Sequence, residues 1–186
     1  SSDLITAHDT ISAKESISQD LWPVAHDLYK MGAVFRNVLT NAVEAMPDGG
    51  TLKIKAENLA VKDEAQIPGL PVKSGDYVHI SIQDDGMGIP EKHLPRIFDP
   101  YFSTKAMGTQ KGMGLGLATA DAIVKKHGGH IAIDTAPGVG TTVNIYLPAE
   151  TQPEEIKSTI TSTAEKASPV KRVLVMDDEE MLRNLA

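Results

Sequence analysis

Apolar residues recur at helical spacing in the first half of the chain, between residues 31 and 46. This spacing predicts an amphipathic helix, which Pro-Asp-Gly-Gly at 47–50 would end. A second helix is predicted from about Leu115 to His127, because Gly128 and Gly129 follow at the usual C-terminal position. The apolar positions of the first helix are Val34, Phe35, Val38, Leu39, Ala42, Val43 and Met46.

Other segments alternate between apolar and polar residues, which is typical of strands. The segment 11–18 (ISAKESIS) is expected to be an edge strand, and 51–56 a short one. Further strands are predicted at 77–83, 131–135 and 141–147. Prolines at positions 90, 95 and 100 exclude long regular structure between residues 86 and 111.

Composition narrows the function classes. The 186 residues include 18 Lys and Arg against 25 Asp and Glu, a formal net charge of −7, which argues against a general nucleic-acid or anionic-membrane surface. The chain has no cysteine, which excludes disulfides and thiolate metal sites and fits the cytoplasm. Neither a signal peptide nor an apolar run of roughly 20 residues, as a membrane-spanning helix needs, is visible. Ten of the 15 glycines fall between Gly86 and Gly140, so this region needs backbone that side chains would obstruct.

The composition changes after Pro148. Residues 149–169 are rich in Thr, Ser, Glu and Lys, which is typical of a linker. An apolar strand and an acidic run, VKRVLVMDDEE, follow at 170–180. We therefore expect a main domain at 1–148, a linker at 149–169 and the truncated start of a second domain at 170–186.

Polar residues gather on one face of the first predicted helix. At 100° per residue, Asn37, Asn41 and Glu44 lie within about 60° of one another. Asn is a poor helix former, so two of them one turn apart are unusual on a helix surface. Their oxygens suit a hard cation such as Mg²⁺, which shares its shell with water and phosphate. A solvated polar face is the alternative.

Asp84 falls in phase with the apolar residues of the strand 77–83. A carboxylate buried there without a partner would cost several kcal/mol. A ligand donor, such as a purine amino group, would relieve that cost, and Gly86 and Gly88 would allow a tight turn and the close approach of a flat ligand. The alternative is a turn with a self-capping Asp. Asp85 points the other way and is expected to be a surface residue.

A glycine-rich segment leads directly into the second predicted helix. It matches neither the Walker A nor the Rossmann pattern, yet a glycine loop before a helix start suits an anion. Residues 101–130 carry four lysines against one Asp, a local charge of +3. The alternative is a flexible loop with solvated charges.

Thr141 is in phase with the apolar residues of the last predicted strand, so its hydroxyl could join Asp84. An ordinary β-branched strand residue is the alternative. His127 and His130 are expected at a helix end and a strand start rather than at a metal.

Together these segments resemble the ATP-binding catalytic domain of sensor histidine kinases, within the wider group that includes gyrase, a heat-shock chaperone and MutL. The resemblance covers residues 11–148, in the family's order and spacing. Its N, G1, F, G2 and last glycine boxes are matched by NVLTNAVEA (37–45), DDGMG (84–88), IFDPYFSTK (97–105), KGMGLGL (111–117) and PGVGTT (137–142).

The resemblance implies an α+β fold, a two-layer α/β sandwich of the Bergerat type, with a mixed, mostly antiparallel sheet packed on helices. Asn41 would coordinate Mg²⁺, and Asn37, the expected catalytic residue, would lie beside the triphosphate of ATP. Asp84 would accept from the adenine amino group, assisted by Thr141. The other residues expected to contact the nucleotide, several of them in a mobile lid over the phosphates, are Glu44, Gly86, Gly88, Lys105, Lys111, Gly112, Gly114, Leu115, Gly116 and Leu117.

One departure separates this chain from part of the group. The gyrase-like ATPases carry a Glu at the position of Asn37, where it activates water, and an amide cannot act as that base. The resemblance therefore implies that the domain binds ATP with Mg²⁺ and donates the γ-phosphate to a histidine on a separate dimerisation domain. The chain alone would not phosphorylate itself. A gyrase-like ATPase and a nucleotide-sensing module without transfer are the alternatives.

The tail resembles the first strand and acidic pocket of a response-regulator receiver domain, where Asp177 and Asp178 would help bind Mg²⁺. The parent would then be a hybrid histidine kinase in a two-component phosphorelay. Its expected partners are the histidine-bearing dimerisation domain and a receiver domain or response regulator, with no nucleic acid.

Overall fold

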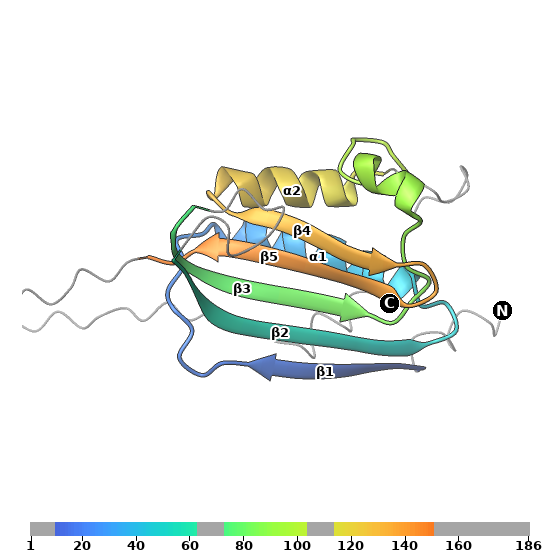
Figure 1. Cartoon of the computed structure of the whole chain (residues 1–186), viewed down its shortest axis with the longest axis horizontal. Helices are drawn as coiled ribbons and strands as arrows, with labels where there is room; N and C mark the ends of the chain where they lie inside the picture. Colours follow the sequence, from blue (N-terminus) through green and yellow to red (C-terminus); the bar gives the residue numbers. More distant parts are fainter. Residues whose placement is uncertain (1–9, 63–72, 104–113, 151–186) are drawn as a thin grey trace, which may run out of the picture.

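The computed structural model of the chain describes residues 10–62, 73–103 and 114–150. In this part of the chain a five-stranded sheet carries two helices on one face (Figure 1). The strands run in the order β1-β2-β3-β5-β4. β1 pairs with β2 in parallel, and the other neighbours pair antiparallel. The expected α+β fold with a mixed, mostly antiparallel sheet is confirmed.

The strands cover the predicted segments, with one large difference. β1 (Ile11–Ile17) lies at the sheet edge as predicted, whereas β2 (Gly50–Val61) runs well past the predicted end at residue 56. Its second half pairs with β3 (Gly75–Asp84), and this long pairing keeps it extended. β4 (His130–Ala136) and β5 (Gly140–Pro148) form a hairpin.

Asn58 explains why the second half of β2 lacks a clean alternation. Its Oδ1 accepts from the Trp22 N–H at 2.8 Å, and its Nδ2 donates to the Asp20 carbonyl at 2.8 Å. Both partners belong to the connection between β1 and α1. Asn58 therefore fixes the segment that connects β1 to α1 across the second half of β2, a contact that the sequence pattern does not reveal.

The helix α1 (Leu28–Glu44) packs its apolar side against the sheet and begins three residues before the apolar repeat that starts at residue 31. Asp27 sets that start, because its Oδ1 accepts from the Tyr29 and Lys30 N–H groups at 3.1 and 3.2 Å. The core between the layers includes Val34, Phe35, Val38, Leu39, Leu52, Ile80, Ile82, Val124, Val143 and Ile145.

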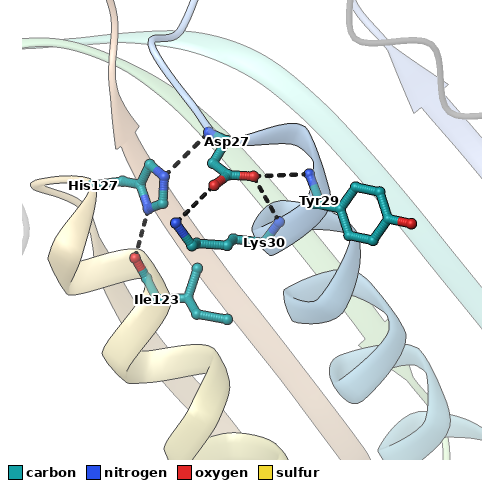
Figure 2. Close-up of polar contacts among 5 residues, drawn as sticks. All are labelled: Asp27, Tyr29, Lys30, Ile123 and His127. Atoms are coloured by element: carbon teal, nitrogen blue, oxygen red, sulfur yellow. Dashed lines mark hydrogen bonds and ion pairs between the residues drawn. The ribbon is translucent and has the colours of Figure 1, made fainter.

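The helix α2 (Gly116–Lys126) runs beside α1, and its C-terminal end is tied to the start of α1 (Figure 2). His127 Nδ1 lies 2.8 Å from the Ile123 carbonyl, while its Nε2 lies 3.2 Å from the Asp27 N–H. Because a carbonyl only accepts, Nδ1 carries the proton and Nε2 accepts from Asp27. The two helices are therefore antiparallel and linked at this end.

Within its described part, residues 86–103, the proline-containing segment forms a short 3-10 helix, η3 (Glu91–Arg96), and no longer helix or strand, as expected there. In the described ranges, no helix is long and apolar enough to cross a membrane. β5 ends at Pro148, the expected limit of the main domain, although Ala149 and Glu150 still hydrogen-bond to Asp76 and Pro23. The proposed receiver start and all but these two residues of the proposed linker lie outside the described residues.

Replacing Asn58 tests how much the segment that connects β1 to α1 depends on it. Asn58→Ala removes both hydrogen bonds and should lower the free energy of unfolding by about 1–3 kcal/mol in urea titrations. Gln83→Ala, an exposed position on β3, is the control and should stay within about 0.5 kcal/mol of wild type. Equal effects of the two substitutions would contradict the role given to Asn58.

Candidate functional site

Asp84 ends β3 on the helix-facing side of the sheet, in phase with Ile80 and Ile82 as predicted. Its exposed fraction is 5%. One carboxylate oxygen, Oδ1, accepts from the backbone N–H groups of Gly86 at 3.0 Å and Thr141 at 3.2 Å. No hydrogen bond from the described residues reaches the other oxygen, Oδ2. The second oxygen is therefore available as an acceptor at the edge of the core.

Burial raises the pKa of Asp84 above its ordinary value. The N–H groups of Gly86 and Thr141 act in the opposite direction, and the charge of Asp85 adds to the increase. The hydrogen bonds from the protein therefore offset only part of the cost of burying the charged carboxylate. A donor from a ligand would improve its environment, which is the situation that the sequence predicts.

Gly86 and Gly88 are required by close backbone packing. A Cβ on Gly86 would collide with the Ala45 carbonyl oxygen, which accepts from the Met87 N–H at 3.0 Å. Gly88 has φ +67°, and a Cβ there would collide with the Ala136 carbonyl oxygen. The loop after β3 is thus clamped between the end of α1 and the β4–β5 turn. That Gly86 and Gly88 also allow a flat ligand to approach stays a prediction.

Asp85 differs from its expected role as a plain surface residue. Its side chain is exposed, but its Oδ1 accepts from the Thr51 N–H at 2.7 Å, near the start of β2. Gly50 leaves room for this contact, because a Cβ there would collide with the Asp85 carboxylate. The two adjacent carboxylates therefore separate: Asp85 fastens the loop to β2, and Asp84 faces the core.

Thr141 lies directly opposite Asp84 in the pairing of β3 with β5, as expected, and its exposed fraction is 8%. The backbone N–H of Thr141 contacts Asp84, whereas its hydroxyl lies 3.1 Å from the hydroxyl of Thr135 on β4. Sequence reasoning missed Thr135. Its position opposite Thr141 in the β4–β5 hairpin is the signal that could have found it.

The polar residues of α1 are half-buried rather than a solvated face. These residues are Asn37, Asn41 and Glu44. A Cβ built on Gly116 would lie 3.7 Å from the Asn37 Cβ and 3.8 Å from its Oδ1. Asn37 therefore borders the start of α2, where free backbone N–H groups favour an anion.

The end of α1 connects this place to Asp84. Ala45 follows α1 and contacts the loop after Asp84, because its carbonyl oxygen accepts a hydrogen bond from the Met87 N–H. Asn37 and Ala45 are eight positions apart, which is about 12 Å along a helix. α1 thus runs between the N-terminus of α2, beside Asn37, and the loop that follows the buried acceptor Asp84.

The residues just before α2 contact the segment that follows η3. Gly114 has φ +66°, and its carbonyl accepts from the Tyr101 N–H at 2.9 Å. Leu115 and Leu117 are half-buried around the start of α2. Lys105, Lys111 and Gly112 lie outside the described residues, so their predicted phosphate contacts remain predictions.

No cluster of three or more His, Cys, Asp or Glu side chains suited to a metal occurs among the residues that the structure describes. The oxygen donors on α1, which borders the start of α2 at Asn37, are the carboxamides of Asn37 and Asn41 and the carboxylate of Glu44. Oxygen donors on one helix match a cation that takes most of its ligands from phosphate and water.

Comparison with known proteins adds a family match. A family model described as "Histidine kinase-, DNA gyrase B-, and HSP90-like ATPase" matches residues 26–151. The chain is 37% identical over 180 residues to "Sensor kinase CckA" of Brucella abortus, a match covering 93% of this chain and 19% of that protein. It is 37% identical over 138 residues to "Sporulation kinase A" of Bacillus subtilis, covering 74% of this chain and 20% of that one. The chain thus spans about a fifth of the length of these relatives.

Solved structures agree with the family match. The mycobacterial sensor histidine kinase MprB superposes with a TM-score of 0.59 and 27% identity, over 76% of this chain and 84% of that one. The catalytic domain of histidine kinase ThkA gives a TM-score of 0.58 and 27% identity, over 75% and 80%.

The raised pKa of Asp84 predicts a pH-dependent stability. A native carboxyl with a raised pKa contributes stability that is complete below the ordinary Asp pKa and lost as the pH rises through the native pKa. Asp84→Asn removes this titration and can still accept from Gly86 and Thr141. In urea unfolding, its stability relative to wild type should increase with pH from about 4 upwards and then level off.

Asp85→Asn is the matched control, because it makes the same change at the adjacent, exposed position. A stability of Asp84→Asn that falls relative to wild type as the pH rises would contradict the buried-charge interpretation.

Proposed function

Because this chain belongs to the family of histidine kinase-, DNA gyrase B- and HSP90-like ATPases, we propose that it is the ATP-binding catalytic domain of a sensor histidine kinase. In this proposal it binds ATP with Mg²⁺ and donates the γ-phosphate to a histidine on a separate dimerisation domain of its parent. The parent would act in a two-component phosphorelay. The single observation that carries the nucleotide site is the buried carboxylate of Asp84, with Oδ1 saturated by two backbone N–H groups.

The base of the nucleotide would bind at the end of β3. Asp84 Oδ2 accepts one hydrogen of the adenine amino group, and the neighbouring Thr141 assists from β5. A charged acceptor is stronger than a neutral one, and here it also relieves the cost of a buried carboxylate. Support for this placement comes from the burial of Asp84 and from its direct pairing with Thr141.

The phosphates would bind beside the start of α2. Backbone N–H groups at this helix start are suited to phosphate oxygens, and Gly116 in its first turn lies beside Asn37. The glycines of the preceding segment and Lys105 and Lys111 belong to this part of the proposal. About 12 Å of α1, from Asn37 beside this end to Ala45 beside the loop after Asp84, lies between the two proposed ends.

The donor set fits a magnesium ion held by Asn41. When bound, the ion would neutralise charge on the phosphate oxygens during transfer. Asn37 would orient the triphosphate and cannot take a proton, since an amide is not a base near neutral pH. In the proposed transfer, a histidine nitrogen of the partner domain bonds to the γ-phosphorus while the bond to the bridging oxygen breaks, and ADP leaves.

Nucleotide binding is the first test. Calorimetric titration of the wild type with ATP and Mg²⁺ should show binding, and Asp84→Asn should weaken it by about 10- to 150-fold, the value of one hydrogen bond to a charged group. Asp85→Asn should bind like wild type. Failure of the wild type to bind, or unchanged binding by Asp84→Asn, would overturn the site.

The reaction requires a second test, with γ-labelled ATP and the parent's histidine-bearing domain added in trans. Label on a histidine supports the kinase. Rapid release of labelled phosphate by the chain alone would favour a gyrase-like ATPase instead, and tight binding with neither outcome would favour a nucleotide-sensing module. A receiver domain added afterwards tests the proposed phosphorelay partner.

A further inference from the structure

The hydroxyl of Thr135, near the end of β4, makes three hydrogen bonds in addition to the backbone pairing of the strand. Its hydroxyl oxygen lies 2.9 Å from the Ile89 N–H, 3.0 Å from the Gly140 carbonyl oxygen and 3.1 Å from the Thr141 hydroxyl. These three partners come from the loop after β3 and from the start of β5. A single side chain thus joins the segments that surround Asp84.

Counting hydrogens determines the direction of each bond. The Gly140 carbonyl can only accept, so the one hydroxyl hydrogen of Thr135 must go to it. The Ile89 N–H can only donate to Thr135. All three contacts are satisfied only when Thr141 donates its own hydrogen to Thr135. The opposite assignment would leave the Thr135 and Gly140 oxygens facing each other at 3.0 Å without a hydrogen.

The direction of the Thr141–Thr135 hydrogen bond determines what Thr141 can offer to a bound base. Once its hydrogen is directed to Thr135, the Thr141 hydroxyl offers only lone pairs to a ligand. Asp84 is also an acceptor when ionised. The two side chains that face this end of the site therefore present acceptors alone, and a ligand must bring the donors.

We propose that Thr135 is a positioning residue that holds the Thr141 hydroxyl as an acceptor and so makes the site select an amino-purine over an oxo-purine nucleotide. The inference rests on the proposed function, since it assumes that the base binds at Asp84. The amino group at position 6 of ATP carries two hydrogens, one for each of the two acceptors. ITP carries an oxygen acceptor at that position and only the single N–H at position 1, so it leaves one of the acceptors of Asp84 and Thr141 without a donor and binds less tightly.

Removing the Thr135 hydroxyl should change this selection. In Thr135→Val the Thr141 hydroxyl is free to rotate and can donate to the base oxygen of ITP, which strengthens ITP binding, whereas Asp84 still accepts from the amino group of ATP. The ratio of ATP to ITP affinity should therefore fall by about 3- to 10-fold, the effect of one neutral hydrogen bond. Thr135→Ser keeps the hydroxyl and should restore the wild-type ratio.

The experiment measures ATP and ITP affinities with Mg²⁺ by calorimetry for the wild type and these variants. Thr142→Val is the matched control, because it removes a hydroxyl from the adjacent residue on the opposite face of β5. It should leave the affinity ratio unchanged. Thr135→Ala is the second variant if the branched side chain of valine disturbs folding, and thermal unfolding verifies that each variant is folded.

A nucleotide-free measurement tests the hydrogen bonds separately. Amide exchange at Ile89 should accelerate in Thr135→Val and Thr135→Ala but not in Thr135→Ser. If the wild type binds neither nucleotide, the proposed function fails and the selection inference with it. If the wild type binds ATP and the Thr135 variants keep its ATP-to-ITP ratio, the proposed function stands and only the role of Thr135 is overturned.

Discussion

The carboxylate of Asp84 is buried at the end of a central strand, and the surrounding backbone is arranged to hold it there. Its Oδ1 receives the N–H of Gly86 from the following loop and the N–H of Thr141 from β5. Burial still raises its pKa, so the protein only partly compensates the charge. The alternative of a self-capping turn is therefore partly right, because Gly86 does cap Asp84, but the cap uses only one oxygen.

The loop that supplies this cap depends on close backbone contacts at both ends. Gly86 lies against the Ala45 carbonyl after α1, and Gly88 lies against Ala136 at the end of β4. A side chain at either position would push the loop away from its neighbours and move the N–H that Asp84 needs. The position of the acceptor thus depends on contacts between three elements that are distant in sequence.

The two helices extend this arrangement into a site with two ends. His127 and Asp27 join the end of α2 to the start of α1 (Figure 2). The antiparallel packing places the start of α2 beside Asn37. α1, which borders the proposed phosphate end, also contacts the loop after Asp84 through Ala45. The relative position of the two ends is therefore set by the rigid length of α1 between Asn37 and Ala45.

In the described part of the chain, local patterning was enough to locate α1, α2, the five strands of the sheet and the inward direction of Asp84, because helical and strand periodicity indicate which face is buried. It did not reveal the full length of β2, the capping role of Asp27, or the bonds of Asp85 to Thr51 and of Thr135 to Thr141. Each of these depends on a partner brought close only by folding. Hydrogen-bond direction in particular requires all neighbours of a hydroxyl to be known, so only the tertiary structure could decide that Thr141 is a donor to Thr135.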